Sequence, residues 1–161
     1  MFIKSKPIIA IYGSNSNNLP NEFLTEGFNI GNFFGKLDCH LILPDTSLNL
    51  YTNSIVEGLL FHKKDKNHTF CNEPEKKINN SDILLFLPGD LQTLADLIFC
   101  LNYNKILKKP KPIIIYNFLN FYNNLLNWLE EVSLINMIEK TGDLFCISRS
   151  LNELNYFFQE V

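Results

Sequence analysis

The chain of 161 residues contains very little arginine: of its 14 basic residues only Arg149 is an arginine, and the rest are lysines. A lysine cannot offer the planar pair of donors with which a guanidinium holds a phosphate or carboxylate, so a mechanism built on such a clamp has one candidate residue. The formal net charge is −3, and no basic half, tail or stripe is present. These features speak against a dedicated nucleic-acid-binding protein.

Cysteine and histidine are also scarce and widely spaced. The four cysteines form no Cys-x-x-Cys pair, and the three histidines show no His-Glu-x-x-His spacing. Zinc sites need clustered ligands, and disulfide frameworks belong to shorter secreted chains. We therefore expect no metal, no disulfide and no bound cofactor.

Long hydrophobic runs are missing as well. The apolar stretch near the N-terminus, residues 8–13, is too short for the hydrophobic part of a signal peptide and for a membrane span. We expect a cytoplasmic protein without a membrane partner. Neither the Gly-x-Gly-x-x-Gly fingerprint of dinucleotide-binding folds nor a phosphate-binding P-loop sequence occurs.

The sequence does contain short, nearly continuous apolar runs, at residues 7–12, 40–43, 82–87, 112–116 and 143–147. Such runs are typical of strands covered on both faces, as in a parallel sheet. Longer segments between them have apolar residues at helical spacing, at 23–37, 91–101, 125–135 and 151–158, and Ser150 is placed to cap the last.

The alternation of strands and helices predicts an α/β fold, a Rossmann-like three-layer sandwich with a mainly parallel sheet. A single domain spanning residues 1–161 is expected, since this length suits one hydrophobic core. The polar segment 63–80 has no apolar periodicity and is interpreted as a solvated loop or the frayed end of a helix.

In such a fold, ligands bind where the strands end, beside the switch in strand order. Gly13 and Ser14 follow the first predicted strand, and their backbone amides next to a helix start suit an anion. An ordinary strand-to-helix turn explains the same residues.

A more specific pattern follows the third predicted strand. Pro88 and Gly89 form a turn, Asp90 or Thr93 lies near the cap of the next helix, and Asp96 lies one helical turn after Thr93 on the same face. An anion or ribose could meet donors of Gly89 and Thr93, with Asp96 accepting from a sugar hydroxyl. A turn, a cap and a solvated carboxylate are the structural alternative.

The order of these motifs resembles the lonely-guy (LOG) family over essentially the whole chain. The family motif Pro-Gly-Gly-x-Gly-Thr-x-x-Glu is matched by Pro88, Gly89, Thr93 and, conservatively, Asp96. Further similarity lies in Ile11-Tyr12-Gly13-Ser14, Lys111-Pro112-Ile113, Asn117 and Phe121-Tyr122-x-x-Leu125-Leu126. The central part is shorter than in the family, as though a strand and loop between residues 63 and 80 were lost.

This resemblance implies a Rossmann-like domain related to nucleoside 5′-monophosphate phosphoribohydrolases, which cleave the N-glycosidic bond of cytokinin riboside monophosphates or AMP. It implies a homodimer, a nucleoside monophosphate or another small phosphorylated ligand as partner, and no cofactor. Asp96 would be the catalytic carboxylate, and Gly13, Ser14, Pro88, Gly89 and Thr93 would bind the nucleotide and its phosphate.

The sequence departs from the family pattern where the chemistry would take place. Asp90 and Gln92 replace two motif glycines, and Glu73 and Pro74 stand where the family has its Arg-Lys pair. Under an enzymatic reading, Lys76 or Lys77 would substitute for the missing arginine. We therefore expect a nucleotide-binding domain with weak or lost catalysis; the alternatives are an active phosphoribohydrolase and a non-catalytic dimerising scaffold.

Overall fold

The computed structural model describes residues 6–45, 49–62 and 67–159, which form a six-stranded parallel sheet of order β3-β2-β1-β4-β5-β6 between layers of helices. The predicted Rossmann-like α/β class is confirmed. The strands are β1 (Ile8–Tyr12), β2 (His40–Leu43), β3 (His68–Phe70), β4 (Ile83–Phe86), β5 (Ile113–Tyr116) and β6 (Cys146–Ser148). The helices are α1 (Asn21–Lys36), α2 (Leu50–His62), α3 (Pro74–Asn79), α4 (Leu91–Asn104), α5 (Asn123–Leu134), α6 (Thr141–Leu144) and α7 (Leu151–Tyr156), with a 3-10 turn η1 (Phe118–Asn120).

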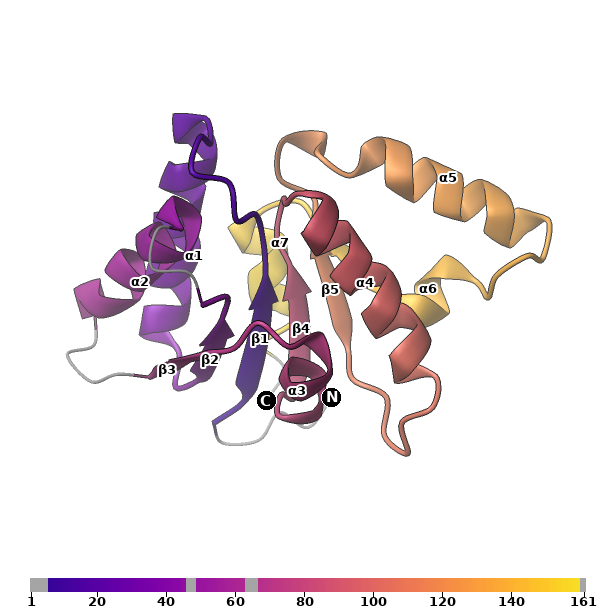
Figure 1. The fold of residues 1–161 in the computed structure, drawn as a ribbon, viewed down its shortest axis with the longest axis horizontal. Coiled ribbons are helices and arrows are strands. Elements are labelled where there is room, and N and C mark those ends of the chain that lie inside the picture. Colours follow the sequence, from indigo (N-terminus) through magenta and orange to yellow (C-terminus); the bar gives the residue numbers. More distant parts are fainter. Residues whose placement is uncertain (1–5, 46–48, 63–66, 160–161) are drawn as a thin grey trace.

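The two faces of the sheet build two separate cores. Along β1, Ile9 and Ile11 pack with residues of α1, α2 and α7, whereas Ala10 and Tyr12 pack with residues of α3, α4 and α5. Figure 1 shows α1 and α2 on one side of the sheet and α4 and α5 on the other. Since side chains alternate between faces, a strand covered on both sides must be apolar throughout, which explains the continuous runs.

Two predicted helix starts are confirmed. The Asp90 side chain accepts a hydrogen bond from the Thr93 N–H at the start of α4, and the Ser150 side chain accepts one from the Glu153 N–H at the start of α7. Both satisfy a backbone donor that the first turn leaves without a partner.

The predicted loop over residues 63–80 is wrong for its described part, which contains β3 and α3. The strand expected to be missing here is therefore present. β3 lies at the sheet edge with Phe70 49% exposed, so no apolar run marks it. α3 has six residues and buries a lysine, Lys77, beside Ile78, so no hydrophobic periodicity marks it either. Residues 63–66 lie outside the described part of the chain.

One further prediction needs correction, and one helix was not predicted. In the run 143–147, Asp143 and Leu144 belong to α6, and strand β6 begins at Cys146. Helix α2 was not predicted, because its apolar residues are distributed around the helix and form no single stripe. In the described residues, no helix is long and apolar enough to cross a membrane.

Helices α1 and α2 pack so closely that their contact requires glycine. A Cβ atom on Gly31 would lie 1.9 Å from the carbonyl oxygen of Ile55, and one on Gly58 would lie 2.0 Å from the carbonyl oxygen of Phe28. Backbone atoms cannot move aside as a side chain can, so these two glycines set the distance between the helices.

Gly31→Ala and Gly58→Ala should each lower the free energy of unfolding by about 1–3 kcal/mol or more, because the added methyl group forces the helices apart. Gly142→Ala is the matched control, since a Cβ there meets nothing within 4 Å. Urea denaturation of the three variants measures the effect. Equal stability of Gly31→Ala and Gly142→Ala would contradict this account of the helix contact.

Candidate functional site

The strand order reverses direction between β1 and β4, the two central strands of the sheet. From β1 the chain moves outward through β2 and β3, and from β4 it moves the other way through β5 and β6. The loops that follow β1 and β4 therefore diverge and leave a crevice at their carboxyl ends. Two cavities lie here, one on each side of the sheet.

The first cavity, which we call the switch pocket, has a volume of about 310 Å³ and mostly polar walls. Its lining comes from the ends of β1, β2 and β3 and from helices α3 and α4. The lining residues are Tyr12, Gly13, Asn15, Pro44, Asn72, Lys77, Gln92, Thr93 and Asp96. Three of the predicted site residues, Gly13, Thr93 and Asp96, are thus brought together.

Among the described residues of this lining, Lys77 supplies the only basic side chain. It is 3% exposed, its Nζ donates a hydrogen bond to the carbonyl oxygen of Ile11, and the Nζ lies 3.9 Å from the centre of the Tyr12 ring. Burial lowers the pKa of Lys77 to about 8, although Asp96 favours the charged form. A buried amine that titrates near neutral pH in a polar pocket is a functional candidate.

Asp96 extends from α4 toward the same pocket. The Gln92 side chain donates a hydrogen bond of 2.9 Å to its Oδ1. Burial raises the pKa of Asp96, while Gln92 and Lys77 act in the opposite direction. The pocket thus combines one cation, one carboxylate and several amide side chains, a set that suits a small polar molecule with hydroxyl groups and an anionic group.

The structure distinguishes between the two lysines proposed to replace the family's arginine. Lys77 lines the switch pocket, whereas Lys76 is exposed and forms an ion pair with Glu73. Arg149 follows β6 at the edge of the sheet and is absent from the pocket lining.

The Asp90 carboxylate occupies the start of α4, where a bound anion was expected. Its Oδ1 accepts from the Thr93 N–H at 3.1 Å and from the Thr93 hydroxyl at 3.3 Å, and its Oδ2 accepts from the Asn15 N–H at 3.0 Å. We call this set of hydrogen bonds the Asp90 bridge. Partial burial opposes ionisation of Asp90, but the hydrogen bonds outweigh it and lower its pKa.

The Asp90 bridge also explains the sequence motif in structural terms. A Cβ atom on Gly89 would lie 2.2 Å from the Thr93 hydroxyl oxygen, so glycine makes room for a threonine that is 2% exposed. Gly89 and Thr93 thus fit together as a strand-to-helix turn, and the Thr93 donors point to Asp90.

The loop after β1 is held from its other side by Asn49. The Asn49 side-chain amide donates to the Ser14 carbonyl oxygen and to Asn15 Oδ1, both at 3.1 Å, while its own Oδ1 accepts from the N–H groups of Tyr51 and Thr52 at the start of α2. Ser14 is 4% exposed, and its hydroxyl oxygen accepts from the Ser16 N–H. Sequence reasoning missed Asn49 because asparagine is common throughout this chain.

The second cavity, which we call the Tyr51 pocket, lies on the α1 side of the sheet and has a volume of about 240 Å³. Its walls are almost wholly apolar and come from the loops after β1 and β4, helices α1 and α2, and the segment after η1. The lining residues are Ser14, Leu19, Pro20, Phe23, Tyr51, Pro88, Gly89 and Phe121.

The predicted site residues, the nucleotide-binding ones and the catalytic Asp96, are therefore divided between two cavities. Gly13, Thr93 and Asp96 line the switch pocket, whereas Ser14, Pro88 and Gly89 line the Tyr51 pocket. The hydrogen bond between Asn15 and Asp90 joins the loop after β1, which contributes to both cavities, to the residue that precedes α4. Within the described ranges, no group of histidine, cysteine or acidic side chains could hold a metal ion.

Comparison with known proteins identifies similar folds. No protein-family model and no curated protein matches this sequence. Two solved structures of the Moco carrier protein from Chlamydomonas reinhardtii are similar with TM-scores of 0.69 and 0.66 at 11% and 13% identity; each alignment covers 96% of this chain, and 96% and 97% of those chains. HAL3 from Cryptococcus neoformans is similar with a TM-score of 0.52 at 9% identity, over 90% of this chain and 86% of that one. These likenesses show a shared α/β fold.

The titration of Lys77 can be measured through stability. Between pH 8 and 10 the unfolded chain keeps a lysine proton that the folded protein has lost, so Lys77 makes stability rise with pH. The unfolding free energy of the unsubstituted protein minus that of Lys77→Met should therefore become more positive as the pH rises from 8 to 10. Lys76→Met, which removes the exposed neighbour, should leave the slope of stability against pH unchanged. Parallel pH profiles for the unsubstituted protein and Lys77→Met would show that burial does not perturb this amine.

Proposed function

We propose that this chain is a binding domain for a nucleoside 5′-monophosphate or a similar small phosphorylated ligand, with weak or no cleavage of the N-glycosidic bond. The observation that carries the proposal is the switch pocket, in which buried Lys77 and partly buried Asp96 come together at the reversal of strand order. This is the position at which open α/β sheets bind ligands.

The two charged groups suit the two ends of such a ligand. The Lys77 ammonium has three donors: the Ile11 carbonyl oxygen accepts from one, and the Tyr12 ring covers another side of the Nζ at 3.9 Å, which leaves one donor to face an anion. Asp96 can accept hydrogen bonds from ribose hydroxyls, and Gln92 holds its carboxylate in place. The ring face of Tyr12 and the Asn15 side chain complete a wall on the β1 side.

The same residues support binding more than turnover. Cleavage of an N-glycosidic bond develops positive charge at the sugar, which a carboxylate such as Asp96 could stabilise. The phosphate, however, would meet one lysine and no arginine among the described residues of the lining, and the Asp90 bridge already uses the Thr93 N–H at the start of α4. A second carboxylate beside a phosphate repels it.

We also propose that the chain is related to the LOG phosphoribohydrolases and has lost part of their glycine-rich motif. An active phosphoribohydrolase that uses Asp96 is the alternative. The Moco carrier protein has a similar fold and, as its name says, carries a ligand. This supports a binding role for a chain with this architecture.

Isothermal titration of the protein with AMP tests the proposal. We expect binding that weakens at least tenfold in Lys77→Met, about 1.4 kcal/mol, and changes less than twofold in the matched control Lys76→Met. Affinity should also fall as pH rises through about 8, because Lys77 loses its charge.

Chromatography of the same mixtures should show little or no release of free adenine. Release sustained over many turnovers, and abolished by Asp96→Asn, would establish the active phosphoribohydrolase instead. Absence of heat with AMP, ribose 5-phosphate and inorganic phosphate would favour a non-catalytic scaffold.

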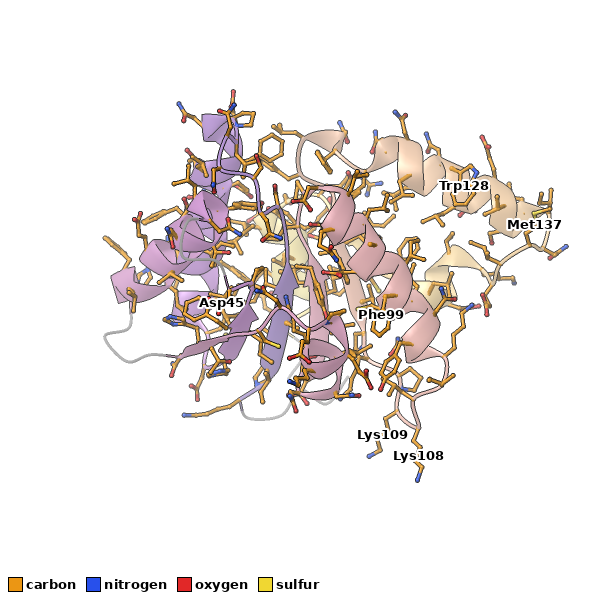
Figure 2. All side chains as sticks on the ribbon, in the orientation of Figure 1. Asp45, Phe99, Lys108, Lys109, Trp128 and Met137 are labelled. Atoms are coloured by element: carbon orange, nitrogen blue, oxygen red, sulfur yellow. The ribbon has the colours of Figure 1, made fainter. Side chains whose placement is uncertain are left out.

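We further propose that a second copy of the chain covers the apolar surface of α4 and α5. Leu91 and Phe99 on α4 are 84% and 37% exposed, and Trp128 on α5 is 55% exposed. Figure 2 labels Phe99 and Trp128 on these two helices. Exposed aromatic residues of this size are typical of interfaces between proteins.

Light scattering coupled to gel filtration should show a dimer that Trp128→Glu converts to a monomer, because a carboxylate buried in the interface lacks a partner. Phe61→Glu is the control, since Phe61 is a comparably exposed aromatic residue on α2 (72%). A monomeric unsubstituted protein, or dissociation by Phe61→Glu alone, would argue against this interface.

A further inference from the structure

A further cavity lies between helices α1 and α7, and none of its described lining residues belongs to the switch pocket or to the Tyr51 pocket. We call it the α1–α7 groove. Its volume of about 350 Å³ lies within the roughly 300–1,000 Å³ of sites that bind small ligands. Asparagine and lysine side chains line it together with a few large apolar ones.

The hydrophobic core holds the two walls of the groove in place. Leu154 of α7 is fully buried in the same core cluster as Ile30 and Phe34 of α1. The ring of Phe158, which follows α7, meets the rings of Phe33 and Phe34 edge to face, with centroids 6.0 and 5.5 Å away. The groove is therefore a preformed feature of the packed helices.

Asparagine side chains in the groove have hydrogen-bonding groups that the chain itself does not use. Elsewhere, the Asn104 side chain bonds with both ends of its amide, since it accepts from the Lys111 N–H and donates to the Lys111 carbonyl oxygen. The side chains of Asn152 and Asn155 on α7 have no such partner among the described residues. Asn152 is exposed and Asn155 is half-buried, so both amides can meet a ligand.

The spacing of these asparagines suits a ligand with a repeating pattern of amides. Asn152 and Asn155 are three residues apart on α7, and Asn29 and Asn32 have the same spacing on the α1 wall. Side chains three residues apart on a helix have their Cβ atoms about 5–6 Å apart. An extended peptide repeats the N–H and C=O groups of one edge every second residue, about 6.6 Å. Because an asparagine amide carries the same donor and acceptor as a peptide group, each can pair with one peptide unit.

The remaining lining residues narrow the choice of ligand. Lys36 is exposed and forms no ion pair within the described part of the chain, so it favours a carboxylate on the ligand. Leu37 and Leu151 add apolar surface. Phe33, the aromatic residue of this lining, already packs against two other phenylalanine rings, which disfavours a sugar or base stacked on it.

We propose that the α1–α7 groove binds an extended peptide segment of a partner protein. The asparagines pair with the peptide backbone, and Lys36 pairs with an acidic side chain. An apolar side chain two residues away from the acidic one lies on the same side of the extended peptide and contacts Leu37 or Leu151. The proposal rests on this groove alone and is independent of ligand binding in the switch pocket.

Four capped pentapeptides, acetyl-Ala-x-Ala-Glu-Ala-amide with Leu, Ile, Val or Phe at x, are the probes, and NMR titration of the ¹⁵N-labelled protein measures binding. The side-chain amide signals of Asn152 and Asn155 should shift. We expect the double substitution Asn152→Ala, Asn155→Ala to weaken binding at least tenfold, as for the loss of two hydrogen-bonded pairs. Asn53→Ala, which removes an exposed asparagine of α2, is the matched control and should change binding less than twofold. Alanine favours helices more than asparagine does, so these variants keep their fold.

Two changes to the peptides separate backbone recognition from simple charge attraction. N-methylation of the three alanines removes the N–H groups of one edge and should weaken binding at least tenfold. Replacing Glu with Gln should weaken binding to the unsubstituted protein about twofold to fivefold, as for an exposed ion pair, and should not affect binding to Lys36→Met.

Absence of binding by all four peptides overturns the proposal, as does equal binding of the N-methylated peptides or of the double asparagine variant. AMP at saturating concentration should leave peptide binding unchanged. Competition between the two would place the peptide in the switch pocket and also overturn the proposal, whereas failure of AMP to bind would leave these expectations as they are.

Discussion

The Asp90 carboxylate connects the loop after β1, which lines both cavities, to the start of α4, which lines the switch pocket. The carboxylate accepts hydrogen bonds from the N–H and hydroxyl of Thr93 at the start of α4 and from the N–H of Asn15 in the loop after β1. A helix start with unpartnered donors attracts anions. Here the chain supplies that anion itself, as a side chain, and uses it to hold together the carboxyl ends of the two central strands.

The position of the Asp90 carboxylate at the start of α4 determines which charged groups of the switch pocket can meet a ligand. With an internal carboxylate at the start of α4, the main attraction for an external phosphate comes from Lys77 on α3, which approaches the switch pocket from the β1 side. Two cavities of different polarity lie at the switch: a polar one lined by Lys77 and Asp96, and an apolar one lined by Tyr51.

Sequence patterns predicted the central fold because burial on both faces demands apolar strands, which are visible as continuous runs at β1, β2, β4 and β5. The patterns did not predict elements that are only partly buried or that bury a charged residue. β3 is an edge strand, α2 is apolar on several sides, and α3 buries Lys77, a residue type that normally indicates a surface. Gly13, Thr93 and Asp96 line one cavity because they follow the parallel strands β1 and β4 at the same edge of the sheet, whereas Ser14, Pro88 and Gly89 line the other cavity.

The sequence by itself determined the α/β class, the start of α4 near Asp90 or Thr93, and the edge of the sheet at which polar residues gather, since all three depend on local spacing and strand periodicity. Only the tertiary structure decided which donors stay available, because hydrogen bonds between Asp90 and Asn15, or Asn49 and Ser14, join residues far apart in the chain. It also decided that Lys77 and not Lys76 enters the pocket, since adjacent helical positions point in different directions. Arginine is scarce in this chain, and the cationic side chain at the switch pocket is a lysine, Lys77. It lies on α3, a helix that no sequence pattern predicted.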